Sequence, residues 1–274
     1  PYSAHQYDQD IAPAQLARWQ TLDGEGLFAM PLDMPPMVMY YRTDILDQAG
    51  FPTDPAELAE YLKDEEHLLD LAKALKAQGK LFMPAMGIYE PSLSTTKAGY
   101  FDKQLNYVRN TEQWAKELEL DKKVKQLGLA QTLSIFTDEG KQAINSGDMP
   151  IIFSGSWLSM PDYLPAYAPS LQGKWKVTAV PMGLYGGWGG AGLALLSQSK
   201  NKEAAWAFMQ YATVSLDGWA VSLKAQPSIP GYMPAWDLPE IKDEVNPYLE
   251  QNANQLFVEL NRQMPADAYG LATP

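Results

Sequence analysis

The chain has 274 residues and a formal net charge of −12, from 33 acidic and 21 basic side chains. This acidic balance argues against nucleic acid or an anionic membrane as a partner, because both select basic surfaces. Hydrophobic residues make up 46% of the sequence, which is enough for one large or two moderate globular domains. No apolar run reaches the roughly 18 residues of a membrane span. The first residues are polar rather than signal-like, so we expect any targeting segment to have been removed.

Cysteine is absent, which excludes disulfides, thiolate metal ligands and cysteine nucleophiles. The two histidines, His5 and His67, are far apart in the sequence. His67 lies among acidic residues on a predicted helix surface, where a solvated role is favoured over a catalytic or ligating one. We therefore predict no metal site, no cofactor and no catalytic residue.

Short apolar segments alternate with amphipathic segments along the chain. The predicted helices cover residues 14–19, 44–49, a region from 54 to 79, 114–127, 139–145, 201–213 and 241–260. The predicted strands cover residues 27–31, 37–41, 82–88, 149–153, 175–180 and 191–196. Asp54 can cap its helix and Pro55 suits the first helical position. This alternation predicts an α/β fold with mostly parallel sheets.

The helix at 201–213 has a clear apolar periodicity. We expect its core face to consist of Ala205, Phe208, Met209 and Ala212.

Residues 187–192 formally match the dinucleotide-binding pattern G-x-G-x-x-G. That site requires a strand before the glycines and a helix after them. Residues 193–196 instead predict a strand, and Trp188 occupies the turn. We interpret the glycines as a flexible crossing between two bodies, with Trp188 facing a cleft.

Trp157 and Trp188 each lie in a turn of small residues beside a predicted strand end. Tryptophan usually packs in a core, but such turns are surface features. A ring at a cleft can stack on a sugar while nearby carboxylates accept its hydroxyls. Asp33 and Glu90 can serve as these acceptors, or as solvated loop acids.

The same two carboxylates leave a glycoside hydrolase open, since that chemistry needs two acids about 5–10 Å apart. A scaffold or interaction domain without a small ligand is a third interpretation. No other catalytic motif is present.

Several segments carry recognisable patterns in a consistent order between residues 27 and 212. They are residues 30–33, 40–46, 49–52, 143–148, 154–157, 180–181, 189–190 and 199–208. Together they resemble the extracellular solute-binding proteins of ABC sugar importers, in the cluster that includes maltose-binding protein. Each segment is weak alone, and their order and spacing carry the resemblance.

This resemblance implies a two-lobed type II periplasmic-binding-protein fold of the α/β class. Residues 36–187 would form lobe II, and residues 1–35 and 188–274 would belong to lobe I, which is incomplete in this chain. The resemblance also implies a periplasmic or extracellular, cell-surface-associated monomer without enzymatic activity. Its ligand would be a carbohydrate and its partners the permease subunits of an ABC importer.

The resemblance implies ligand contacts at both crossings between the lobes. Asp33 matches an acid that binds sugar hydroxyls, Trp157 a stacking aromatic, and Trp188 with Gly189 a segment that faces the cleft.

A further loop, from Gly87 to Glu90, matches a segment that reaches the ligand. Ser92 stands where the family has an aromatic residue just after this loop. That difference favours a mono- or disaccharide, or a polyol, over a long maltodextrin.

Overall fold

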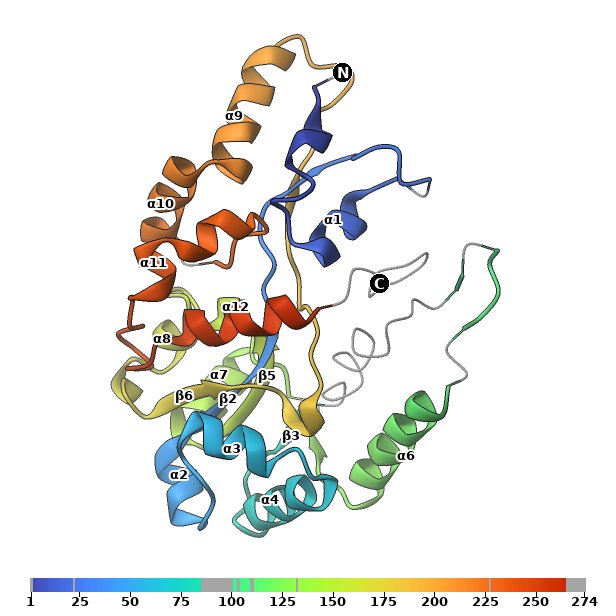
Figure 1. The fold of residues 1–274 in the computed structure, drawn as a ribbon. Helices are drawn as coiled ribbons and strands as arrows, with labels where there is room; N and C mark the ends of the chain where they lie inside the picture. Colours follow the sequence, from blue (N-terminus) through green and yellow to red (C-terminus); the bar gives the residue numbers. More distant parts are fainter. Residues whose placement is uncertain are drawn as a thin grey trace.

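The computed structural model describes residues 2–21, 23–84, 101–102, 104–108, 111–131, 133–226 and 228–264. The expected ligand loop from Gly87 to Glu90, and Ser92, lie outside the described residues. Figure 1 shows a lower part built around a sheet and an upper part made mostly of helices. Extended segments, drawn in blue and gold, run between the two parts.

The lower part is built on a three-stranded sheet. Its central strand is β2 (Met37–Arg42), flanked by β5 (Ile151–Gly155) and β6 (Trp175–Thr178). All six residues of β2 are buried. Val38 and Tyr40 face one apolar cluster, while Met39 and Tyr41 face another. Because side chains alternate along a strand, this apolar run is covered on both faces of the sheet.

The expectation of mostly parallel sheets is wrong for these strands, since β2 is antiparallel to both neighbours. β5 and β6 run in the same direction, but β2 lies between them. β2 begins at the end of the sheet where β5 finishes, so that Met37 pairs with Gly155. β3 (Met83–Pro84) and β4 (Ala130–Gln131) form a separate parallel pair.

Three helices cover the face of Met39 and Tyr41. They are α2 (Thr43–Gln48), α3 (Pro55–Tyr61) and α4 (Glu65–Ala77). Asp54 accepts hydrogen bonds from the amides of Ala56 and Glu57, as its predicted cap requires. His67 stacks on Tyr61 with ring centroids 4.1 Å apart and is exposed.

The remaining helices of the lower part are α6 (Glu112–Gln126), α7 (Asp138–Ser146) and α8 (Leu164–Tyr167). Short 3-10 turns complete it, namely η2 (Ser156–Ser159), η3 (Pro169–Leu171) and η4 (Pro181–Gly183). The upper part contains η1 (Ala4–Tyr7), α1 (Pro13–Trp19), β1 (Met30–Pro31), β7 (Gly192–Leu193), α9 (Lys202–Val214) and α10 (Leu216–Ala225). No helix among the described residues is long and apolar enough to cross a membrane.

The predicted core face of α9 is partly wrong. Met209 is 7% exposed, as expected, but Phe208 is 63% exposed. The helix turns Met209, Thr213 and Val214 inward, toward the small cluster around β1. Phe208 is thereby left on the outer face.

The predicted helix at 241–260 is two helices, α11 (Pro239–Lys242) and α12 (Ala253–Gln263), which follow η5 (Met233–Asp237). Pro247 lies in the interruption, and a proline cannot supply a helical amide donor. The Asn246 side chain accepts instead from the amides of Tyr248 and Leu249, both at 3.0 Å. These bonds stabilise a turn where the periodicity had predicted a helix.

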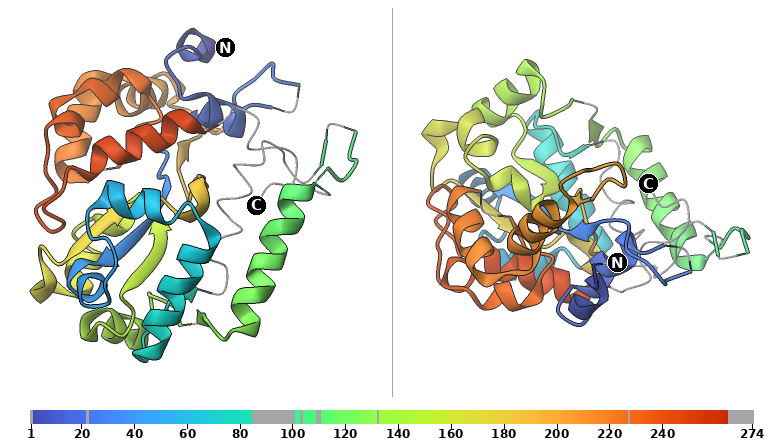
Figure 2. Two further views of the ribbon diagram at one scale, coloured as in Figure 1. Left: turned by 60° about the horizontal axis from the view of Figure 1, so that its bottom comes forward. Right: turned by 90° about the horizontal axis from the view of Figure 1, so that it is seen from above.

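We expected residues 188–274 to share a lobe with residues 1–35. The Gln251 amide instead bonds the Val177 backbone of β6, accepting at 2.9 Å and donating at 2.8 Å. α12 lies between the orange helices and the sheet (Figure 2, left). We therefore propose that lobe II also includes residues 246–264.

Candidate functional site

Three extended segments meet where the upper and lower parts join, namely residues 32–37, 186–191 and 229–231. The first segment bonds the second through the amides of Leu32, Met37 and Trp188, at 2.8–2.9 Å. It bonds the third through Met34 N to Ile229 O at 2.9 Å and Gly231 N to Leu32 O at 2.8 Å. Four of the six predicted site residues lie on or beside these crossings.

Asp33 lies on the first crossing and is half-buried. Its Oδ1 accepts from the Ala191 amide at 2.7 Å, and its carbonyl accepts from Gln15 Nε2 at 2.7 Å. Burial raises the pKa of the Asp33 carboxyl, while the Ala191 hydrogen bond and the charge of Arg18 oppose this shift. The Ala191 bond fixes the orientation of the carboxyl group.

Trp157 follows β5 in η2 and is half-buried. Its Nε1 donates to the Trp188 carbonyl at 3.1 Å. Phe136 stacks against its ring at 6.0 Å between centroids, and Tyr163 meets it at 5.1 Å and 61°. A Cβ added at Gly155 would lie 2.2 Å from Trp157 Nε1, so the indole needs a glycine at this position.

Gly189 and Gly190 have φ angles of +98° and +106°, a region that L-residues rarely adopt. Arg18 Nη1 of α1 donates to the Gly189 carbonyl. The Trp188 side chain packs against the cluster that covers Met39, and is half-buried.

The structure thus brings Asp33, Trp157 and Gly189 together. A Cβ at Gly189 would lie 3.8 Å from Trp157 Nε1, and one at the adjacent Gly190 would lie 3.0 Å from the Asp33 carbonyl. Trp188 joins this group through its backbone. Glu90 lies outside the described residues.

Four neighbours of the site had not been predicted, namely Gln15, Arg18, Phe136 and Tyr163. Gln15 and Arg18 are three residues apart on α1, so they share one helix face. This spacing indicates that the two side chains lie on one face of the helix, but it does not indicate which residues that face contacts. Phe136 is 55% exposed and lies in a short loop without any pattern.

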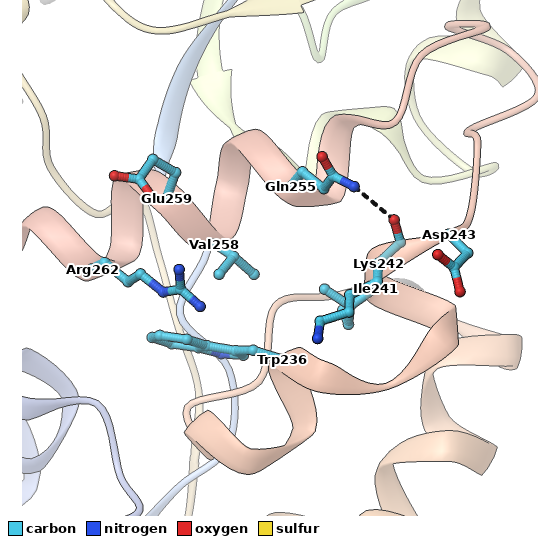
Figure 3. Close-up of a pocket in the computed structure, with 8 residues that line it drawn as sticks. All are labelled: Trp236, Ile241, Lys242, Asp243, Gln255, Val258, Glu259 and Arg262. Carbon is cyan, nitrogen blue, oxygen red and sulfur yellow. Dashed lines mark hydrogen bonds between the residues drawn. The ribbon is translucent and has the colours of Figure 1, made fainter.

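A cavity of about 510 Å³ lies elsewhere, between η5, α11 and α12 (Figure 3). Its base is Trp236, and the Arg262 guanidinium carbon lies 5.7 Å from that ring (Figure 3). Trp236 is 5% exposed and its Nε1 donates to the Pro230 carbonyl. Arg262 covers the ring, so the cavity offers no open stacking face. Among the described residues, no group of three or more His, Cys, Asp or Glu side chains could hold a metal ion.

The family described as bacterial extracellular solute-binding protein matches residues 4–215. The chain belongs to this family. It is also 26% identical over 268 residues to the lactose-binding protein of Rhizobium radiobacter, covering 92% of this chain and 61% of the relative. This solute-binding protein thus spans less than two thirds of that relative's length.

Two solved structures show the same fold. One, named extracellular solute-binding protein family 1, has a TM-score of 0.83 at 22% identity, covering 96% of this chain and 68% of the other. The other is the galacto-N-biose-/lacto-N-biose I-binding protein of the Bifidobacterium longum ABC transporter, in complex with lacto-N-biose. It has a TM-score of 0.74 at 17% identity, covering 97% of this chain and 67% of the other. The solute-binding protein therefore has the two-lobed type II fold.

Proposed function

We propose that this solute-binding protein captures a carbohydrate at the crossings between its lobes and delivers it to the permease of an ABC importer. The observation that carries the proposal is the meeting of Asp33, Trp157 and Gly189 on chain segments that join the two lobes. A ring face and a fixed carboxyl group are the two elements that sugar recognition requires. The names of the lactose-binding and lacto-N-biose-binding relatives support the same class of ligand.

We propose a mono- or disaccharide, or a polyol, as the ligand. Phe136 and Tyr163 both pack against Trp157, which limits the ring surface available for stacking. Ser92 in place of an aromatic residue supports the same conclusion. The protein would act as a monomer outside the cytoplasmic membrane, where its family operates, and as a binder rather than an enzyme.

Titration calorimetry against neutral mono- and disaccharides and polyols tests this function. Saturable one-to-one binding is expected, with a loss of at least tenfold for Trp157→Ala and for Asp33→Asn. Phe208→Ser serves as the matched control, because Phe208 is an exposed aromatic on α9. Failure of every carbohydrate to bind would refute the proposal, and release of reducing sugar would instead identify a hydrolase.

A further inference from the structure

Two side chains from opposite lobes hold consecutive carbonyl groups of one crossing. Trp157 Nε1, in η2 just after β5 in the lower part, donates to the Trp188 carbonyl at 3.1 Å. Arg18 Nη1, on α1 in the upper part, donates to the next carbonyl, that of Gly189. Since α1 lies in the upper part and β5 in the lower part (Figure 1), the two donors reach adjacent peptide groups from two different bodies.

The backbone between these contacts has few constraints of its own. Gly189 and Gly190 follow one another with positive φ angles, and glycine has the widest conformational freedom of any residue. A Cβ at Gly190 would lie 3.0 Å from both Arg18 Nη1 and the Asp33 carbonyl. This close approach explains why a side chain cannot replace the second glycine without moving Arg18.

Arg18 is itself held in place by α1. Its guanidinium carbon lies 5.5 Å from the Trp19 ring, and Trp19 Nε1 donates to Gln15 Oε1 at 3.0 Å. Gln15 Nε2 in turn donates to the Asp33 carbonyl at 2.7 Å. One helix therefore contacts both the crossing that carries Asp33 and the crossing that carries Gly189.

We infer that Arg18 and Trp157 are positioning residues that clamp the 188–190 crossing from opposite lobes. They would set the balance between an open form, in which the lobes are apart, and a closed form, in which the lobes come together around the ligand. This inference rests on the proposed function for its link to ligand capture. An indole has one N–H donor, and Trp157 commits it to the Trp188 carbonyl. A sugar would therefore contact the ring face of Trp157 and not its N–H group. The same side chain would then contact both the sugar and the Trp188 carbonyl of the crossing.

The absence of native cysteine allows two engineered cysteines to be labelled specifically. Gln78→Cys on the lower part and Gln198→Cys on the upper part are both at exposed positions. Single-molecule energy transfer between the labels reports the open and closed populations. Trp157→Phe keeps a stacking ring but removes the donor, and Arg18→Met keeps an aliphatic stem without the guanidinium.

In ligand-free protein we expect each substitution to change the ratio of the two populations by about threefold to tenfold, the effect of one lost hydrogen bond. Trp219→Phe is the matched control, because it removes an indole bond of 2.9 Å to the Thr213 carbonyl, away from the crossing. Trp219→Phe should lower the melting temperature but leave the ratio unchanged. If Trp157→Phe and Arg18→Met show the same ratio of open to closed populations as the parent, the proposed clamp is wrong.

Affinity separates this inference from the proposed function. Arg18→Met leaves the Trp157 ring in place, so it should change carbohydrate affinity only by the factor by which it changes the population ratio, whereas Trp157→Ala should lose at least tenfold. If the parent protein binds no carbohydrate, the proposed function fails. The ligand-free measurement then still decides whether the clamp exists.

Discussion

Gly155→Ala tests the geometry of the site most directly. The added Cβ would lie 2.2 Å from Nε1 and 2.6 Å from Cδ1 of Trp157, and 2.9 Å from the Trp188 carbonyl oxygen. Carbon atoms attract one another best near 3.5–4.0 Å, so the indole must move by about 1 Å or more. That movement costs about 1–3 kcal/mol for overpacking and about 0.5–1.5 kcal/mol for the lost bond to Trp188.

We therefore expect Gly155→Ala to lower the free energy of unfolding by about 2–4 kcal/mol. A loss of 2 kcal/mol corresponds to roughly 4–8 °C in melting temperature for a chain of this size. Thermal and urea unfolding, followed by circular dichroism, give both quantities. Gly26→Ala is the matched control, since its Cβ would lie 3.3 Å from a Thr21 side chain that can move.

A double-mutant cycle identifies the cause of the loss. In a Trp157→Ala background the indole is gone, so Gly155→Ala should cost at least 1 kcal/mol less than in the parent. Equal costs in the two backgrounds, or a cost for Gly155→Ala no larger than that of Gly26→Ala, would refute the close packing of Trp157 on this glycine.

Three further predictions concern Asp33, Tyr40 and α9. Burial raises the pKa of Asp33 above its ordinary 3.8, so the folded protein binds this proton more tightly than the unfolded chain does. The stability that the bound proton contributes is therefore present at low pH and is lost as pH rises from 3.8 through the raised pKa. The unfolding free energy of Asp33→Asn relative to the parent, measured by urea unfolding, should therefore increase between pH 3.5 and 7. Tyr40→Phe removes a 2.9 Å bond to the Ser156 carbonyl and should cost about 1 kcal/mol in urea unfolding, so an unchanged midpoint would contradict that bond. Met209→Ala should cost about 2–5 kcal/mol and Phe208→Ala about 0.5 kcal/mol or less; the reverse order in thermal unfolding would place the other face inward.

Local chemistry explains which elements were predictable. Asp54 followed by Pro55 fixes the start of α3 through side-chain and ring geometry that need no tertiary partner. The run from Met37 to Tyr41 identifies a buried strand because no exposed strand would be apolar at every position. In each case the physical cause lies within a few residues of the element.

Tertiary contacts decide what the sequence left open. The antiparallel direction of β2 depends on where the chain enters the sheet, which no local pattern records. The apolar residues of α9 are compatible with more than one rotation of the helix, and the cluster around Met209 selects the rotation that exposes Phe208. The break near Pro247 was locally encoded, but the periodicity on both sides outweighed it in the prediction.

The residues of the candidate site fall into the same two groups, namely those recognisable from local sequence and those that depend on tertiary contacts. Asp33 and Trp157 are recognisable because Asp33 is an acidic residue on a proline-rich extended segment and Trp157 is an aromatic residue in a turn, so the local sequence at each already departs from core packing. Arg18 and Gln15 lie within an ordinary amphipathic helix, and their importance comes from the Gly189 and Asp33 carbonyls they contact. Those carbonyls belong to backbone, which has no sequence signature of its own. Candidate ligand contacts can therefore be proposed from side-chain chemistry, whereas residues that contact backbone carbonyls can be identified only once the structure shows where that backbone lies.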